Sequence, residues 1–312
     1  MLATQNRYLK PVVPILIGLV VALVLLVVGS LVSSLGLSGQ GNGTLDWGAV
    51  AKWGSGLLGG VIIAYLLYIQ FVEAPIWQVD TRVVVYSAIG AALYGVFSWA
   101  TNILALPSVS NVSLRPAVVI PVFFGFAFGP IVGFFTGFVG NVLGDALTGW
   151  GVYPVWDVGN GLIGLVCGLV LAFANKKQAL DILTWVTVVI CVIATALVFT
   201  NPHAIDPFSG KEGDFSGFWW IPLLTAVLVL LARYVLASRN IDLAAIAVWG
   251  TLAIVVGIGF SSMLDIYVNG YSFITAFVGE FVPAGGSDLL NAVILAPILL
   301  AAWNAARAQT GR

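Results

Sequence analysis

The chain has 312 residues, of which 60% are hydrophobic and 8% charged, and its 12 basic and 13 acidic residues leave a net charge of −1. A soluble domain carries roughly a quarter charged residues because its surface must be solvated. This composition therefore predicts an integral membrane protein that lies in a lipid bilayer. It offers no basic surface for nucleic acid. Two cysteines and one histidine are too few for a disulfide framework or an ordinary zinc site, so we expect no metal and no cofactor.

Apolar segments run through the whole chain, and crossing a hydrocarbon core of about 30 Å takes about 20 helical residues. Because the runs are continuous and do not alternate between polar and apolar, they predict helices and not the strands of a barrel. The first segment is longer than the apolar core of a signal peptide, so we expect it to be a retained helix. We predict ten segments in chain order: 12–35, 54–72, 83–105, 116–128, 130–148, 158–174, 181–200, 219–237, 241–264 and 287–304.

The basic residues predict how these segments are oriented. With a cytoplasmic N-terminus, ten spans place nine basic residues inside and three outside, as the positive-inside rule requires. The opposite orientation would invert that ratio. We therefore expect both termini in the cytoplasm. The inside residues are Arg7, Lys10, Arg82, Lys176, Lys177, Arg233, Arg239, Arg307 and Arg312, and the outside residues are Lys52, Arg115 and Lys211.

Two stretches depart from the regular pattern. Segment 116–128 is too short for a full crossing and runs through Gly129 and Pro130 into the next helix, which predicts a tight turn. The stretch 265–286 is apolar but interrupted, and we expect an interfacial or re-entrant segment on the outer side. Irregular backbone at membrane depth is tolerated where it lines a cavity.

Polar side chains gather at the predicted outer ends of several helices, where spacings of three and four place them on one helix face. Polar residues in a membrane are costly and often mark a site. For any single residue, however, a structural role is the better default: Asp157 and Asp288 suit N-caps, and Trp150, Tyr153 and Trp156 suit an interfacial aromatic belt. The convergence of several segments predicts an outward pocket for a small, flat, polar organic molecule.

We expect this pocket to bind its substrate through the following residues: Trp99, Asn102, Asn111, Arg115, Asn141, Asp145, Trp150, Tyr153, Trp156, Asn160, Glu280 and Asn291.

Small residues recur at helical spacing in two places. Glycines at every third or fourth position over 125–144 predict close packing of helices within the chain. Ala88 and Ala92 form a second small-residue face, for which the sequence leaves internal packing and docking to another protein equally open. The sequence carries no P-loop motif and no credible catalytic set around its one histidine, His203, so it does not suggest an enzyme.

The run LRPAVVIPVFFGFAFGPIVGFFTGFVGNVLGDALTGWG (114–151), followed by VWDVGNGLIGLVCGLV (155–170), resembles the substrate-binding S component of energy-coupling factor (ECF) transporters, in the riboflavin-transporter-type subgroup. The closing stretch 279–303 is similar to the last loop and helix of that family. The resemblance implies a six-helix bundle that captures a vitamin or related micronutrient outside a bacterial or archaeal cytoplasmic membrane. It also implies two partners, a transmembrane T subunit and a pair of cytoplasmic ATPases.

The resemblance further implies roles for parts of this chain. Ala88 and Ala92 would contact the T subunit, and the loop 105–115 would cover the ligand. The bundle would comprise helices 1–4 within 81–177 and helices 5–6 within 241–312, with extra helix pairs in 1–80 and 178–240. Four additional helices leave an alternative open: an accessory or structural subunit of a larger membrane complex, built on an S-component-like bundle.

Overall fold

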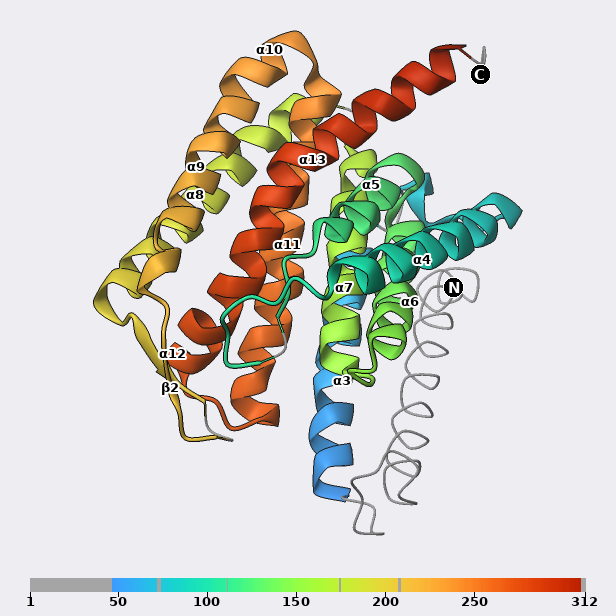
Figure 1. The fold of residues 1–312 in the computed structure, drawn as a ribbon. Coiled ribbons are helices and arrows are strands. Elements are labelled where there is room, and N and C mark those ends of the chain that lie inside the picture. The colour runs from blue at the N-terminus through green and yellow to red at the C-terminus, as the bar shows by residue number, and fades with distance from the viewer. Residues whose placement is uncertain (1–46, 72–73, 111, 174, 207–208, 310–312) are drawn as a thin grey trace.

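The computed structural model of the chain describes residues 47–309, with the exception of 72–73, 111, 174 and 207–208 (Figure 1). The predicted segment 12–35 lies outside the described residues. Each of the other nine segments contains a helix. These are α3 Trp47–Gln70, α4 Thr81–Thr101, α5 Val119–Phe128, α6 Pro130–Thr148, α7 Pro154–Gly168, α8 Lys176–Thr200, α9 Trp220–Leu231, α11 Ile241–Val268 and α13 Val282–Gln309.

Within the described residues, seven helices are long and apolar enough to cross a membrane, and two shorter apolar helices accompany them. The prediction of an all-α integral membrane protein is therefore confirmed. The described strands are one antiparallel hairpin, β1 His203–Ile205 with β2 Glu212–Asp214, which joins α8 to α9. Short helical pieces complete the chain: η1 Pro75–Trp77, η2 Pro116–Val118, η3 Leu169–Ala172, η4 Ser216–Phe218, η5 Ala232–Leu236, α10 Ala237–Arg239, α12 Phe273–Ala276 and η6 Phe277–Phe281.

Local sequence signals account for several helix ends. The Asp80 side chain accepts from the backbone N–H of Val83 and caps α4, and Asn240 caps α11 in the same way. Between α5 and α6 a single residue, Gly129, makes the turn with a φ of 105°, and Pro130 begins the next helix. Only glycine adopts such a φ without strain, so the tight turn expected at this point is present.

α6 lies at the centre of one side of the bundle and packs on both α4 and α7. A Cβ at Gly140 would lie 2.7 Å from the Tyr94 ring, and one at Gly144 would lie 2.7 Å from the Cβ of Ser98. On the other side of α6, a Cβ at Gly137 would overlap the carbonyl oxygen of Asn160 in α7. The glycine stripe therefore lets three helix backbones approach closely, which is the packing role predicted for it.

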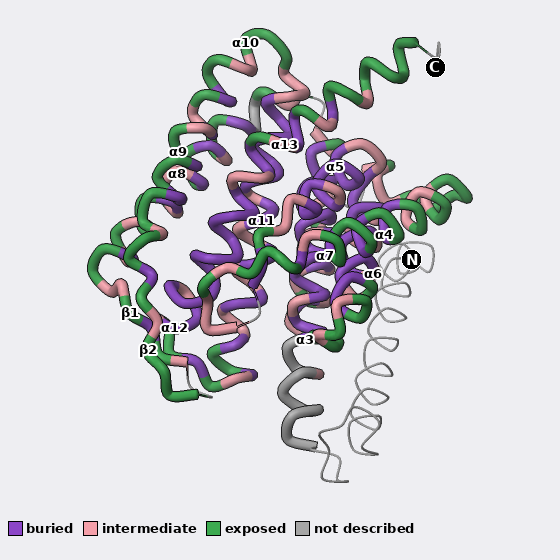
Figure 2. Tube along the Cα trace, viewed as in Figure 1, coloured by how far each residue is buried: buried purple, intermediate pink, exposed green. Residues whose placement is uncertain are grey.

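The remaining helices extend this core outward. α7 also packs on α5 and α11, and α11 packs on α13. In a membrane-length window 83% of the α7 residues are buried, against 28% for α8, so α7 is central and α8 peripheral. The α8–α9 pair packs against α11 and α13, while α3 packs against α7 and α11 (Figures 1 and 2).

The stretch 265–286 is more regular than expected. α11 continues to Val268, and a helical run then begins at Phe273 and passes through α12 and η6 into α13. The π-helical turn η6 ends two residues before Pro283, which lacks a backbone N–H, and a π-turn accommodates such an interruption without ending the helix. Gly279 is a close contact and not a break, since a Cβ there would lie 2.7 Å from Val109, whereas Gly270 makes the turn after α11 with a φ of 74°.

Candidate functional site

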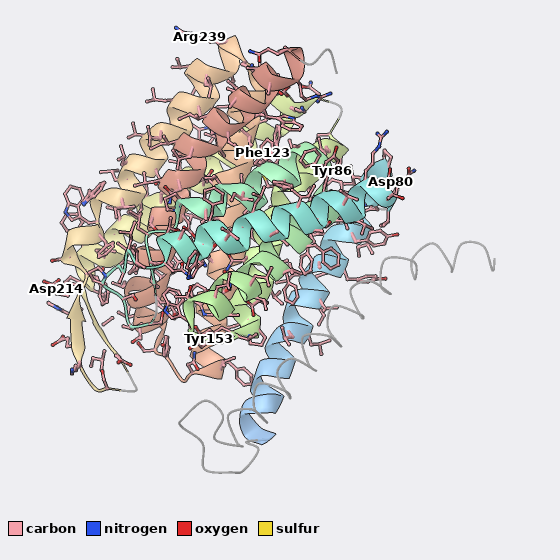
Figure 3. All side chains as sticks on the ribbon, turned by 45° about the vertical axis from the view of Figure 1, so that its right-hand side comes forward. Asp80, Tyr86, Phe123, Tyr153, Asp214 and Arg239 are labelled. Carbon is pink, nitrogen blue, oxygen red and sulfur yellow. The ribbon has the colours of Figure 1, made fainter. Side chains whose placement is uncertain are left out.

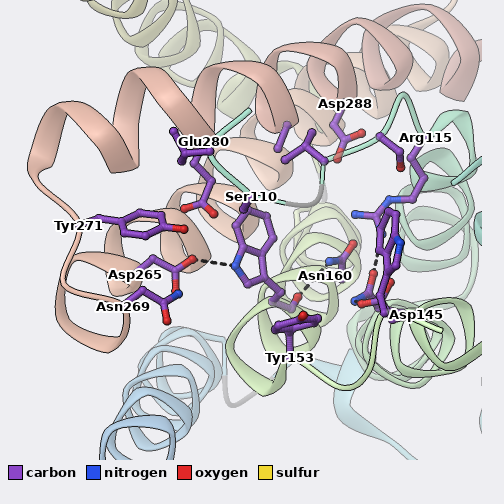
Figure 4. Close-up of a pocket in the computed structure, with 17 residues that line it drawn as sticks. Ser110, Arg115, Asp145, Tyr153, Asn160, Asp265, Asn269, Tyr271, Glu280 and Asp288 are labelled. Carbon is purple, nitrogen blue, oxygen red and sulfur yellow. Dashed lines mark hydrogen bonds between the residues drawn. The ribbon is translucent and has the colours of Figure 1, made fainter. Parts of the chain in front are cut away.

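A cavity of about 360 Å³ lies where the end of α6, the start of α7, the end of α11 and the α12–α13 run meet (Figure 4). Its volume falls within the usual range for small-molecule sites, about 300–1,000 Å³. The lining residues are Val109, Ser110, Val112, Ser113, Arg115, Asn141, Asp145, Trp150, Tyr153, Trp156, Asn160, Asp265, Asn269, Tyr271, Glu280, Ala284 and Asp288.

Eight of the twelve residues predicted to bind substrate line this cavity: Arg115, Asn141, Asp145, Trp150, Tyr153, Trp156, Asn160 and Glu280. Of the other four, Asn111 lies outside the described residues. Trp99 is 51% exposed on α4 and does not line the cavity. Asn102 and Asn291 also lie outside the lining. The buried Asn102 amide donates to Thr148 Oγ1 (2.8 Å) and accepts from Ser113 Oγ (3.1 Å), so it ties α4 to α6 and to the loop.

One end of the cavity is organised around Asn141. Arg115 Nη1 donates to the Asn141 side-chain oxygen at 2.7 Å. The Asn141 amide nitrogen in turn donates to Asp145 Oδ2 (2.9 Å) and Asp157 Oδ1 (2.8 Å). The guanidinium also lies over the Tyr94 ring, 5.9 Å from its centroid. A single buried amide thus joins one cation to two carboxylates.

Asp157 and Asp288 are not the N-caps that their positions suggested. α7 begins at Pro154 with no side-chain cap, and Asp157 is fully buried within the helix. Asp288 lies inside α13 because that helix starts at Val282, and it is 2% exposed in the cavity wall. Both aspartates therefore belong to the buried polar cluster around Arg115.

The opposite end of the cavity is organised around Asp265. Trp156 Nε1 donates to Asp265 Oδ2 at 2.9 Å, and Asn269 Nδ2 donates to Asp265 Oδ1 at 2.8 Å (Figure 4). Glu280 is carried inward by η6 and is completely buried beside this group. π-helical turns occur frequently at functional sites, where the extra residue redirects a side chain.

Asp265, Asn269 and Tyr271 were missed by the sequence reasoning. Asp265 and Asn269 are four residues apart near the end of a predicted span, which is the same signal that identified Asn141 and Asp145. They were overlooked because 265–286 was treated as one irregular segment. Tyr271 follows the helix end and offers no comparable periodic signal, nor do Ser110 and Ser113.

The segment before α5 crosses one side of the cavity. Ala105 pairs with Ser113 as an isolated antiparallel bridge, and Val109 N donates to the Gly279 carbonyl at 2.9 Å. The same loop contributes Val109, Ser110 and Val112 to the lining. The loop is therefore fixed at both its base and its tip, and its tip rests on the turn that carries Glu280.

Arg115 and Tyr271 are titratable groups of the site that lie outside the apolar helices. Burial acts to lower the pKa of Arg115, but the adjacent Tyr94 oxygen and the nearby carboxylates, Asp288 first among them, raise it above its ordinary value. Burial, and after it the charges of Glu280 and Asp265, raise the pKa of the Tyr271 hydroxyl. Arg115 therefore remains a cation, and Tyr271 remains a neutral hydroxyl, at physiological pH.

The polar cavity lies near one end of an apolar bundle. Figure 3 places Tyr153, in the cavity wall, and Asp214 toward one end of the molecule, and Arg239 toward the opposite end. A closed helical bundle with such a cavity has the architecture of a membrane protein that binds a small solute.

Comparison with known proteins finds a family model that matches part of the chain. Residues 78–206 match the family described as the ECF-type riboflavin transporter, S component. The resemblance found in the sequence is thereby confirmed for residues 78–206, which are similar to the S-component family. The matched range contains seven of the eight predicted residues that line the cavity, Glu280 being the exception.

Several curated proteins are similar to parts of the chain. A UPF0397 protein of Vibrio atlanticus is 43% identical over 90 residues, which are 29% of this chain and 48% of the relative. UPF0397 proteins of Aliivibrio salmonicida and Aliivibrio fischeri are each 40% identical, over 54% and 49% of their own lengths. The chain thus spans about half the length of the curated relatives it matches. No solved structure matches the chain.

The family match bears on the helix pair predicted to be inserted at 178–240. The match continues through α8 to residue 206 and stops before α9. The described lining of the cavity, in contrast, includes residues of α6, α7, α11 and α13 and none of α8 or α9. The division of the chain into bundle and inserted pair therefore stays a prediction, which the position of the cavity favours.

Proposed function

We propose that the protein is the substrate-binding membrane subunit of an ECF-type transporter. It would capture a vitamin or similar micronutrient for ATP-driven uptake. The observation that carries this proposal is the cavity, which gathers eight predicted binding residues from three separate parts of the chain. Seven of them belong to the range that matches the S-component family. The aromatic side chains Trp150, Tyr153 and Trp156 supply flat walls, and Arg115 and the amides supply directional hydrogen bonds.

In this proposal the protein lies in the cytoplasmic membrane of a bacterium or archaeon, and the cavity opens outward. Arg239 lies at the end opposite Tyr153, which supports a cytoplasmic position for the Arg239 end by the positive-inside rule (Figure 3). Both chain termini are then cytoplasmic. The cavity-lining helices and α4 and α5 would form the six-helix bundle, and α3 and the α8–α9 pair would surround it.

The proposed partners are a transmembrane T subunit and two cytoplasmic ATPases. Ala88 and Ala92 are both exposed on α4, on a face that also exposes Val84, Val85 and Leu93. Small side chains in such a face allow another helix to approach closely. Because α8 and α9 pack on α11 and α13, they leave this face of α4 free for the T subunit.

Native mass spectrometry of the gently solubilised protein tests the proposal, because it detects bound small molecules and associated chains together. We expect a vitamin-sized adduct and a complex with a T subunit and ATPases. An unliganded protein held in an unrelated membrane complex would overturn the proposal in favour of an accessory subunit, for which the helices packed around the bundle would then form the contact surface.

A further inference from the structure

Glu280 lines the cavity and differs from the other polar residues there. Its side chain is completely buried, and neither carboxylate oxygen makes a hydrogen bond of ordinary geometry within the described residues, although Ser110 and Asp265 lie beside it. Figure 4 shows the carboxylate directed into the cavity beside Asp265 and Tyr271. A buried carboxylate without a partner is strongly unfavourable, so this position needs either a proton or a positive charge.

The neighbouring protein groups do not supply that charge. Asp265, whose oxygens accept hydrogen bonds from Trp156 and Asn269, is itself an acid and brings no positive charge to Glu280. Among the residues that line the cavity, Arg115 is the one cation, against the carboxylates of Asp145, Asp265, Glu280 and Asp288. Its guanidinium bonds to Asn141 at the other end of the cavity.

The aromatic residues at this end suit an organic cation. Trp156 donates a hydrogen bond to Asp265, and Tyr271 lies beside Glu280 and Asp265 (Figure 4). Aromatic faces attract ammonium-type cations. Within the described part of the chain, no three histidine, cysteine or acidic side chains are grouped as metal ligands would be. The arrangement of two carboxylates between aromatic walls therefore fits a nitrogen cation better than a metal ion.

We propose that the Glu280 end of the cavity binds a cationic nitrogen, so that the substrate is a positively charged small molecule. This inference rests on the proposed function of the cavity as a substrate site. Glu280 and Asp265 bind the cationic nitrogen by charge, Trp156 and Tyr271 cover its apolar neighbours, and the Arg115–Asn141 end binds the uncharged polar part of the same molecule.

A retention experiment on the purified full-length protein tests the charge of the ligand. The protein is incubated at pH 7 with two probes: a small-molecule extract of bacterial cells, and an equimolar mixture of known charges. The mixture contains thiamine, choline and N1-methylnicotinamide as cations, riboflavin and nicotinamide as neutral compounds, and biotin and pantothenate as anions. Bound compounds are separated by rapid gel filtration and identified by mass spectrometry.

We expect the retained compounds to carry a cationic nitrogen, and we expect Glu280→Gln to reduce their retention at least tenfold. Asp214→Asn removes one carboxylate from the exposed hairpin, outside the cavity, and should leave retention unchanged. Glu280→Gln should also keep or raise the melting temperature of the unliganded protein, because it removes an unpaired buried charge. A purely structural role for Glu280 would lower that temperature.

Retention of neutral or anionic compounds by the wild type would overturn the inference and leave the proposed function standing. Equal retention by wild type and Glu280→Gln would overturn it as well. A wild-type protein that retains nothing from either probe would overturn the proposed function and the inference with it. If Glu280→Gln does not fold, the charge of the compounds that the wild type retains decides the question alone.

Discussion

Acidic side chains occur both in the cavity and around the α8–α9 pair, but their surroundings differ. Around α8–α9 they are paired: Asp242 with Lys176 at 2.6 Å, and Asp181 with Arg233. In the cavity wall and directly behind it, Asp145 Oδ1, Asp157 Oδ2 and both oxygens of Glu280 are buried and make no hydrogen bond of ordinary geometry within the described residues. The α8–α9 region therefore balances its acidic residues with basic ones, whereas the cavity has more hydrogen-bond acceptors than donors.

The difference follows from what each region has to do. The Lys176–Asp242 pair is partly exposed, so it costs little and contributes little to stability. In the second pair the Arg233 side chain is buried, and the half-exposed Asp181 supplies its counter-charge. Unpaired buried carboxylates destabilise the empty protein, and a fold retains them where a bound molecule can satisfy them. We therefore interpret the α8–α9 charges as structural and the cavity charges as functional, and four substitutions in descending order of effect test that separation.

The largest effect is expected where α6 meets α7, since this contact places Asn141 and Asp145 opposite Asn160. Gly137→Leu would force a side chain onto the carbonyl oxygen of Asn160 and push the two helices apart. We expect loss of monodisperse folded protein in size-exclusion chromatography. Gly217→Ala is the control, because no atom lies within 4 Å of its Cβ position. Normal folding of Gly137→Leu would show that the backbone contact does not hold the cavity together.

Arg115→Ala should have the next largest effect, on ligand binding and not on folding. The substitution removes a charge-assisted hydrogen bond to Asn141 and leaves the cavity carboxylates without their cation. Such bonds contribute about 1.5–3 kcal/mol, so we expect affinity for the retained compound to fall roughly 10- to 100-fold. Isothermal titration measures this, with the exposed Arg239→Ala as control. Unchanged affinity would remove Arg115 from the binding site.

Much of the fold could be predicted from the sequence because the bilayer imposes a simple rule. Helices are the structures that satisfy their own backbone hydrogen bonds in lipid, so long apolar runs translate directly into helices. The glycine stripe of 125–144 was predictable for a similar reason, because a spacing of three and four residues indicates one packed helix face. The error at 265–286 arose where glycine and proline suggested a break that the π-turn and close packing accommodate.

The site was predictable where its residues lie on one helix face and not where loops and tertiary packing bring them together. Asn141 and Asp145 are four residues apart on α6, and both line the cavity. Trp99 and Asn102 have the same kind of spacing on α4, yet Trp99 is exposed, and Asn102 accepts a hydrogen bond from Ser113 in the loop before α5. Spacing identifies a face, but which neighbour that face meets depends on the packing of the other helices.

A smaller effect, limited to assembly, is expected at the exposed face of α4. Ala88→Trp adds a large side chain at a position that contacts neither the cavity nor the α8–α9 pair. We expect weaker copurification of the T subunit with unchanged ligand retention. Arg82→Ala, in an exposed position at the start of the same helix, is the control. Full assembly of the Ala88→Trp protein with the T subunit would place the partner surface elsewhere.

The smallest effect on ligand binding is expected for Asp181→Asn, which breaks the pair with Arg233 outside the cavity. The aspartate side chain is 54% exposed but the Arg233 side chain is only 9% exposed, so the change weakens the pairing of a buried cation and should cost about 1–3 kcal/mol of stability, seen as a lower melting temperature. Asp145→Asn is the matched change inside the cavity, where the carboxylate accepts from Asn141. It should reduce ligand retention, while Asp181→Asn should not. Equal losses of retention in the two variants would mean that the α8–α9 charges also support the site. Retention lost in Asp145→Asn alone would show that the same chemical change acts through ligand binding in one region and only through packing in the other.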